Sequence, residues 1–353
     1  EGDFVGQSTY TSRSEEENRS ILADVIPLDT PYVFGFFVGD ICNFRCKYCV
    51  QSVLQGASGT PHEHKGVKNL VQEFMSWETF LCAADQLQEF PQSIKKILFS
   101  SIGEPLLHPR LPQMISHLNE RHIAGAYEIV TNASVLTPQR SKDLIDAGLT
   151  RLCVSVQGMT AEKYRTICDY KVDMGEFISQ LKFFFEYSRG RCKVHIKTVD
   201  IALDAGEEEQ FLSVFSPICD SIFVDHVIPL YQDVDYDFLS GEEKGIYQDK
   251  PEEVEVCSPL FYTLYVNACG DIIPCCIVPY ATTYGNVHRE TLSTVWNGVQ
   301  RRAFLELHLK KKRCAHTVCK ECVHPNATVL PTDRLDAEAE AVLEHLRERW
   351  RKS

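Results

Sequence analysis

The stretch Cys42-Asn-Phe-Arg-Cys46-Lys-Tyr-Cys49 carries three cysteines with the spacing C-x3-C-x2-C. It directly follows a short apolar run at residues 32–38, whose β-forming side chains predict a strand. Three soft thiolates on one short loop favour an iron–sulfur cluster or zinc. A structural zinc site takes a fourth ligand close by, and the neighbouring sequence offers none. The loop therefore predicts a metal centre with one coordination position open, with a partial zinc knuckle as the alternative.

Similar apolar runs recur beyond this loop and alternate with segments of helical periodicity. The expected strands lie at residues 32–38, 96–100, 126–131, 151–156, 194–199 and 221–227. The expected helices lie between them at residues 79–90, 111–121, 137–147, 160–167, 174–187 and 207–215. Strands that alternate with helices in this way predict βαβ units and a parallel sheet. The pattern alone leaves a partial barrel and a doubly wound sheet as alternatives.

The composition limits the class of protein and its partners. Of the 353 residues, 44% are hydrophobic and 24% charged, as in an ordinary folded protein. The formal net charge is −13, whereas a nucleic-acid binder needs basic surface, so we expect no nucleic-acid partner. No apolar run approaches the roughly 18–20 residues that cross a bilayer, so we expect no membrane partner. Bunched cysteines without a signal peptide indicate metal-binding thiolates in a reducing compartment, which predicts a cytoplasmic protein.

The cysteine stretch resembles the signature of the radical S-adenosylmethionine (radical SAM) superfamily. The resemblance implies that Cys42, Cys46 and Cys49 hold a [4Fe–4S] cluster and that the methionyl group of SAM chelates its open iron. It also implies that Tyr48 lies at the adenine of SAM. The fold that it implies for residues 32–235 is an α/β partial (β/α)6 TIM-like barrel.

Further motifs that resemble those of this superfamily occur in the expected order at the carboxyl ends of later strands. Ser101-Ile102-Gly103-Glu104-Pro105 resembles the motif that binds the SAM amine, although Ile102 replaces the usual first glycine. Asp225-His226-Val227-Ile228-Pro229 closes the sixth strand, where adenine contacts are common in the family. Ligands of parallel sheets bind at this edge, which favours a shared site. The resemblance implies cofactor-binding roles for Tyr48, Gly103, Glu104, Thr131, Asn132, Ser155, Gln157 and Lys197.

A second group of seven cysteines falls within residues 257–322. Four of them have the spacing of a metal ligand set: Cys257, Cys275, Cys319 and Cys322. Spacing alone favours a structural zinc ribbon as much as an iron–sulfur cluster. Beside a radical SAM core, the segment resembles the SPASM and shorter twitch domains, which implies one auxiliary [4Fe–4S] cluster on these four cysteines. Cys276 competes with Cys275 as a ligand, and the spacing Gly270-x4-Cys favours Cys275.

These observations divide the chain into five parts. We expect an N-terminal arm at 1–31, a radical SAM core at 32–235, an acidic linker at 236–256, an auxiliary-cluster domain at 257–325 and a C-terminal helical tail at 326–353. The auxiliary domain is expected to be a small α+β unit. Its two apolar runs flank the turn sequence Gly270-Asp271, and a helical stretch follows at residues 292–311.

The resemblance also implies a reaction class. A reduced cluster and SAM generate a 5′-deoxyadenosyl radical that takes a hydrogen atom from an unactivated C–H bond. A radical SAM core with a short auxiliary domain resembles 2-deoxy-scyllo-inosamine dehydrogenase and neomycin C epimerase. This implies a carbohydrate-like small molecule as substrate, an external one-electron reductant of the flavodoxin or ferredoxin type, and epimerisation or dehydrogenation at a carbinol carbon. Cys276 is the candidate catalytic hydrogen donor of an epimerase. A peptide or protein maturase of the SPASM type is the alternative.

Overall fold

The computed structural model describes residues 3–5, 8–11, 19–54, 73–100, 102–239, 244–278 and 280–352. Ser101 and parts of the expected arm and linker therefore lie outside the described residues. The strands form one sheet in the order β1-β2-β8-β7-β6-β5-β4-β3-β9-β10-β11. Its centre consists of six parallel strands: β3 (Val33–Phe36), β4 (Lys96–Phe99), β5 (Tyr127–Thr131), β6 (Arg151–Val156), β7 (Lys193–Val199) and β8 (Ser221–Asp225).

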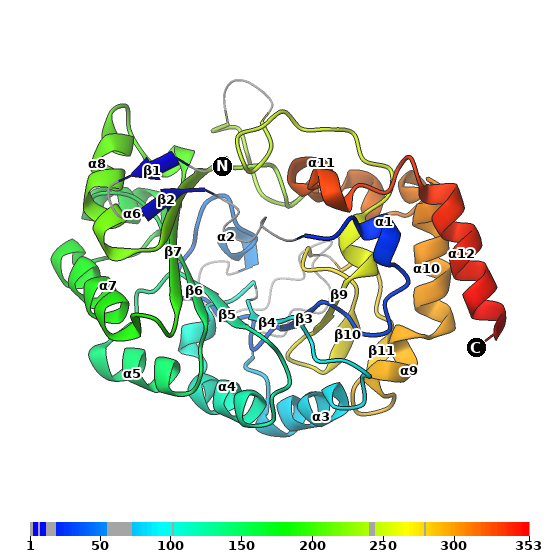
Figure 1. Cartoon of the computed structure of the whole chain (residues 1–353). Helices are drawn as coiled ribbons and strands as arrows, with labels where there is room; N and C mark the ends of the chain where they lie inside the picture. Colours follow the sequence, from blue (N-terminus) through cyan, green and yellow to red (C-terminus); the bar gives the residue numbers. More distant parts are fainter. Residues whose placement is uncertain are drawn as a thin grey trace.

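Helices connect these strands and cover the outer face of the curved sheet (Figure 1). They are α3 (Trp77–Leu87), α4 (Leu111–Glu120), α5 (Pro138–Asp146), α6 (Ala161–Cys168), α7 (Met174–Ser188) and α8 (Glu207–Phe215). In the described part of the chain β3 pairs with β4 and β9, and β8 pairs with β7 and β2, so the curved sheet stays open. The predicted α/β partial barrel is confirmed, and its elements lie within a few residues of their expected positions.

Local sequence explains where the helices begin. The side chains of Ser76, Thr137, Thr160 and Asp173 each accept a hydrogen bond from the backbone N–H three residues later, at the start of α3, α5, α6 and α7. Such N-caps satisfy a donor that the helix itself leaves without a partner. Pro138 follows Thr137 at the first helical position, where a proline costs no hydrogen bond.

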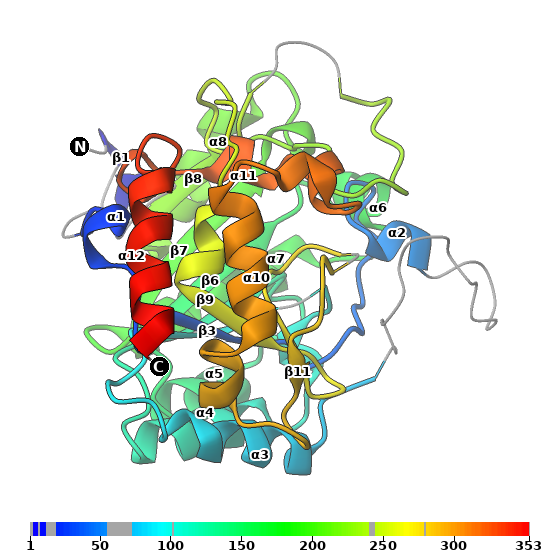
Figure 2. The ribbon, with the colours of Figure 1, turned by 90° about the vertical axis from the view of Figure 1, so that its right-hand side faces the viewer.

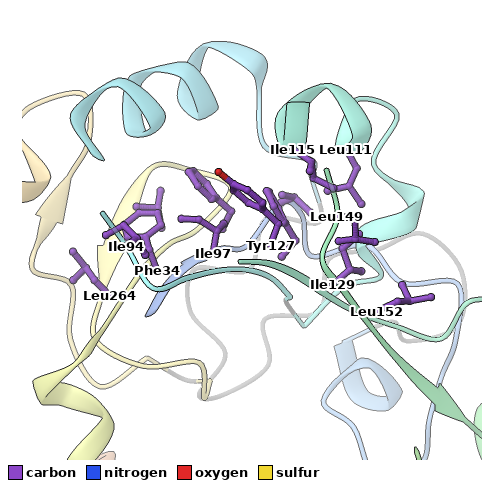
Figure 3. Packing of buried hydrophobic residues seen from close by; sticks show 14 of the residues in the cluster. Phe34, Ile94, Ile97, Leu111, Ile115, Tyr127, Ile129, Leu149, Leu152 and Leu264 are labelled. Carbon is purple, nitrogen blue, oxygen red and sulfur yellow. The ribbon is translucent and has the colours of Figure 1, made fainter. Parts of the chain in front are cut away.

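A continuous apolar core holds the helices on the sheet. Figure 3 shows Phe34, Ile97 and Ile129 from neighbouring strands together with Leu111 and Ile115 from α4. All five side chains are at most 1% exposed. Full burial of such a side chain stabilises the fold by about 1.5–3 kcal/mol, so this packing positions the strand ends rigidly.

The C-terminal part extends the same sheet. The strand β9 (Thr263–Val266) pairs in parallel with β3, β10 (Asp271–Ile273) pairs antiparallel with β9, and β11 (Gly285–Asn286) pairs antiparallel with β10. Gly270 supplies the left-handed turn between β9 and β10, with φ of 83°. The single helix expected over residues 292–311 is two helices, α9 (Leu292–Trp296) and α10 (Val299–Leu309), because the chain turns at Asn297-Gly298.

Two strands and four α-helices of the described residues remain. They are β1 (Asp3–Val5), β2 (Ser8–Tyr10), α1 (Leu22–Val25), α2 (Gln51–Leu54), α11 (His324–Thr328) and α12 (Ala339–Lys352). The C-terminal helix α12 lies along α10 (Figure 2) and buries Val342, Leu343 and Leu346, as its amphipathic pattern predicts. Among the described helices, none has the length and apolar character that a membrane span requires.

Candidate active site

The cysteine loop leaves the carboxyl end of β3 and is anchored to the end of α6. The backbone N–H groups of Arg45 and Lys47 donate to the carbonyls of Cys168 and Ile167 at 2.8 and 2.9 Å. Phe44 is 1% exposed and fixes the middle of the loop in the core. Backbone hydrogen bonds and the buried Phe44 therefore hold the shape of this loop, and the cysteine side chains are not needed for it.

The three thiols of the loop are partly buried neighbours. Burial raises the pKa of Cys42 to about 12, and the nearby Glu104, Cys46 and Cys49 add to the shift. Burial likewise raises the pKa of Cys49 to about 12, with Cys46 adding to it. Thiols in this environment keep their protons until a cation replaces them. Three such thiols on one loop suit a metal centre.

Glu104 links two of the strand ends expected to form the site. Its Oε1 accepts from the Leu106 backbone N–H at 2.8 Å and from the Thr131 hydroxyl at 2.5 Å. Its Oε2 accepts from the backbone N–H of Asn132 at 2.7 Å. An ionised carboxyl offers about four acceptor positions, so three bonds leave about one for a bound ammonium group. Glu104 is 4% exposed, and burial raises its pKa to about 7.

Gly103 lies where no larger residue fits. A Cβ at this position would lie 2.4 Å from the carbonyl oxygen of Gly39 and 2.6 Å from that of Ile41. The buried Gln51 joins the same two loops, because its Nε2 donates to the carbonyls of Asp40 at 2.7 Å and Ile102 at 2.9 Å. Sequence reasoning missed Gln51, whose only local signal is its position two residues after Cys49.

A cavity of about 190 Å³ opens beside Cys49 at the carboxyl ends of β6, β7 and β8. The expected cofactor-binding residues Tyr48, Ser155, Gln157 and Lys197 all line it. The Tyr48 hydroxyl donates to Gln157 Oε1 at 2.6 Å. The structure thus brings these four residues together around one cavity beside the cysteine loop. Glu104, Thr131 and Asn132 form a separate group that is joined by hydrogen bonds.

Lys197 has a partner that sequence reasoning did not assign. Its Nζ lies 2.6 Å from Oδ2 of Asp225, which is 4% exposed. Burial alone would lower the pKa of Lys197, but the Asp225 carboxylate raises it above its usual value. The pair therefore holds one positive and one negative charge at the wall of the cavity.

A second cavity, of about 380 Å³, lies under the C-terminal part of the sheet. Five cysteines line it: Cys257, Cys275, Cys276, Cys319 and Cys322. Burial raises the pKa of Cys257, and Cys275, Cys322 and Cys319 raise it further, so these thiols surround a common space. No three Cys, His, Asp or Glu side chains of the described residues converge as they would around a single metal ion. A four-iron cubane takes four thiolates on separate corners, and the cavity leaves room at their centre.

Cys276 differs from its neighbour Cys275 in what it contacts. It packs against a second apolar cluster, formed by Phe37, Val50, Ile102, Tyr265, Ile273, Val278 and Tyr280. Cys49 and Tyr231 pack against the same cluster. Burial raises the pKa of Tyr231, and the Cys49 and Cys276 thiols raise it further, so both lie near its ring. Cys269 and Cys314, the other unassigned thiols of this region, are exposed.

Comparison with known proteins identifies both halves of this site. Residues 36–209 match the radical SAM superfamily model, and residues 257–323 match the model of SPASM, an iron–sulfur cluster-binding domain. The chain belongs to the radical SAM superfamily. Its two cavities thus lie in a radical SAM domain and a SPASM domain, which carry a SAM-binding [4Fe–4S] cluster and auxiliary iron–sulfur chemistry, respectively.

Proteins with similar sequences match only part of this chain. One is the tungsten-containing aldehyde ferredoxin oxidoreductase cofactor-modifying protein of Pyrococcus furiosus, 27% identical over 38% of this chain and 37% of its own length. Another is the GTP 3′,8-cyclase of Listeria monocytogenes, 31% identical over 37% of this chain and 34% of its own length. The match spans little more than a third of each relative.

Solved structures match across both domains. The structure of BtrN in complex with AdoMet and 2-DOIA has a TM-score of 0.51 at 18% identity, and the match covers 82% of this chain and 92% of that one. Streptococcus suis SuiB bound to S-adenosylmethionine gives 0.56 at 13% identity, over 86% and 74%. Native anSMEcpe with bound AdoMet gives 0.55 at 13% identity, over 91% and 98%. These likenesses establish the fold.

Proposed function

We propose that this radical SAM protein abstracts a hydrogen atom from a carbinol C–H of a sugar or sugar-like small molecule and releases the epimer. The observation that carries the proposal is the place of Cys276, which packs with Cys49 against one apolar cluster. Cys276 also lines the auxiliary cavity, so in this proposal its thiol faces a substrate held between that cavity and the SAM site. An epimerase needs a hydrogen-atom donor there, and the S–H bond of a cysteine is weak enough to serve.

Two ligand sets divide the cysteines in this proposal. Cys42, Cys46 and Cys49 hold the SAM-binding cluster, and Cys257, Cys275, Cys319 and Cys322 hold the auxiliary one. The support for both is the burial and mutual proximity of the thiols. When bound, SAM and the reduced cluster supply a 5′-deoxyadenosyl radical that takes a hydrogen atom from carbon.

The residues around the cysteine loop and the first cavity bind and orient SAM in this proposal. Glu104 meets the ammonium through its remaining acceptor position, as a charge-assisted hydrogen bond. Lys197 meets the carboxylate, and Asp225 keeps its ammonium group in place. Tyr48 and Gln157 form the adenine side of the cavity, because they are hydrogen-bonded to each other at its wall.

Cys276 then acts on the substrate radical. Its S–H bond breaks and a new C–H bond forms on the face opposite to the one that lost hydrogen. The sulfur is left one electron and one proton short, and an external one-electron reductant and solvent restore the thiol. Without this donor the carbon radical would instead lose its hydroxyl proton and pass one electron to an oxidised acceptor, for which the auxiliary cluster would serve, and this gives a ketone.

Exchange with deuterated water tests this function. Candidate sugars and cyclitols are incubated anaerobically with SAM, reductant and enzyme, and the products are analysed by mass spectrometry and NMR. One solvent deuterium at the inverted carbon is expected, because thiol protons exchange with water. Cys276→Ala should still consume SAM but yield no epimer, whereas Cys314→Ala, at an exposed thiol, should keep full activity. A ketone without deuterium from wild type would make the protein a dehydrogenase.

A peptide or protein maturase of the SPASM type is the second candidate. Its support is the likeness to Streptococcus suis SuiB bound to precursor peptide SuiA, with a TM-score of 0.54 over 86% of this chain. Peptide substrates belong in the same deuterium assay. Modification of a peptide, with every carbohydrate-like compound left unchanged, would decide for this class.

A further inference from the structure

His308 lines the auxiliary cavity, and one of its ring nitrogens has no hydrogen-bond partner within the described residues. It lies in the last turn of α10, is 0% exposed and lines the space that the five cysteines surround. Its ring stands edge-on against Phe304, with ring centres 5.0 Å apart. The side chain is therefore held in one orientation by packing.

Its hydrogen-bond pattern determines the tautomer. The backbone N–H of Cys257 donates to Nδ1 of His308 at 3.4 Å. A backbone amide can only donate here, so Nδ1 must offer its lone pair and the ring proton must be on Nε2. Nε2 is buried and has no hydrogen-bond partner within the described residues. Buried donors nearly always have partners, so this N–H is expected to bond a group that occupies the cavity.

Arg313 brings a positive charge to the same space. Its guanidinium is buried and lines the cavity. Its Nη1 donates to the carbonyls of Cys319 at 3.3 Å and Cys322 at 2.7 Å, and its Nη2 donates to Asn326 at 3.4 Å. All three acceptors are neutral, and among the described residues no carboxylate forms an ion pair with it. A buried cation with this surrounding favours an anionic occupant.

We propose that His308 and Arg313 raise the reduction potential of the auxiliary cluster, His308 by donating its Nε2–H to a cluster sulfur and Arg313 by its charge. Reduction adds negative charge to a cluster, so a hydrogen-bond donor and a cation stabilise the reduced form more than the oxidised one. His308 is a positioning residue and not an iron ligand. Its Nε2 carries the ring proton and therefore has no lone pair to offer to iron. This inference rests on the proposed auxiliary ligand set.

A redox titration of the auxiliary cluster tests the proposal. The full chain with Cys42, Cys46 and Cys49 replaced by Ala serves as the parent, so that only the auxiliary cluster contributes to the EPR signal of the reduced protein. His308→Phe in this parent should shift the reduction equilibrium about tenfold towards the oxidised form, about 59 mV for a one-electron couple. His308→Gln, which keeps an N–H donor, should recover most of the shift. His345→Phe is the matched control, since His345 is exposed on α12 and is not among the cavity-lining residues.

The outcomes separate the tuning role from the ligand set. An unchanged potential in His308→Phe, or an equal shift in His345→Phe, would overturn the role of His308. Pulsed EPR of the parent carrying His324→Gln, with 15N-labelled histidine, needs no variant at position 308, because His324 is the other histidine that lines the cavity. A weak nitrogen coupling is expected, while a coupling as strong as that of a direct ligand, or none, would refute the proposal. If the parent binds zinc and no iron, the ligand set is wrong and the inference fails with it.

Discussion

Gly103→Ala should separate the two loops that form the SAM site. The added Cβ would lie 2.4 Å from the Gly39 carbonyl oxygen, roughly 1 Å inside the 3.4 Å at which ordinary contact begins. Both nearest atoms belong to the backbone, so no side chain can move aside. Overpacking of this kind costs about 1–3 kcal/mol. The adjacent hydrogen bond from the Glu104 backbone N–H to the Ile41 carbonyl, now 2.8 Å, contributes about 1 kcal/mol and would be strained as well.

Two measurements follow from this displacement. The free energy of unfolding by urea should fall by about 2–4 kcal/mol. Because Glu104 moves with the loop, the Kd for SAM should rise about 10- to 100-fold, the equivalent of one charge-assisted hydrogen bond. Isothermal titration calorimetry on anaerobically reconstituted protein measures this Kd.

A second glycine provides the control for this substitution. A Cβ at Gly175 in α7 would have its nearest neighbour, Asp173 Oδ1, at 3.4 Å. Gly175→Ala should therefore stabilise the helix by about 0.5–1 kcal/mol and leave SAM binding unchanged. Wild-type stability and SAM affinity in Gly103→Ala would refute the role given to this close approach.

Three further predictions concern the SAM site. Burial raises the pKa of Glu104 to about 7, so between pH 4.5 and 7 the unfolded chain releases this proton more readily than the folded protein does. The free energy of unfolding should therefore fall by up to about 3 kcal/mol as pH rises over this range, and this loss should be absent in Glu104→Gln. Urea unfolding of wild type and Glu104→Gln at pH 5 and pH 8 measures this loss. If the two proteins differed in free energy of unfolding by the same amount at both pH values, the assignment would be contradicted. Cys46→Ala should make no 5′-deoxyadenosine from SAM under strong reductant, whereas Cys314→Ala should; product in the former would remove Cys46 from the ligand set. Lys197→Met should destabilise the protein by about 3 kcal/mol, because it leaves Asp225 buried without its partner, and adding Asp225→Asn should recover part of the loss in thermal unfolding.

Local patterns in the sequence predict the parallel βαβ units of the radical SAM half, and the resemblance to the superfamily decides for a partial barrel over a doubly wound sheet. The alternation of apolar runs with helical segments predicts the helices to within a few residues, although the helix that follows the N-cap Ser76 is expected only from residue 79. The polar residues of the site follow those strands directly. Their convergence is a consequence of parallel topology, since the carboxyl ends of all six strands meet at one edge.

These local patterns do not predict contacts between segments that are distant in the sequence. Nothing local in residues 263–266 indicates that β9 joins β3, more than two hundred residues earlier, so the predicted small domain is continuous with the core sheet. The Lys197–Asp225 pair also depends on the register of two strands. The orientation of His308 depends on a backbone group of Cys257 and has no sequence signal.

Iron and acid-labile sulfide analysis of anaerobically reconstituted protein tests the central claim, that two separate cysteine sets hold two clusters. Wild type should contain about eight irons per chain, the sum of two four-iron cubanes. Replacement of Cys42, Cys46 and Cys49 by Ala should leave about four, and so should replacement of Cys257, Cys275, Cys319 and Cys322. About four irons in wild type, together with tightly bound zinc that disappears only in the second variant, would contradict the account.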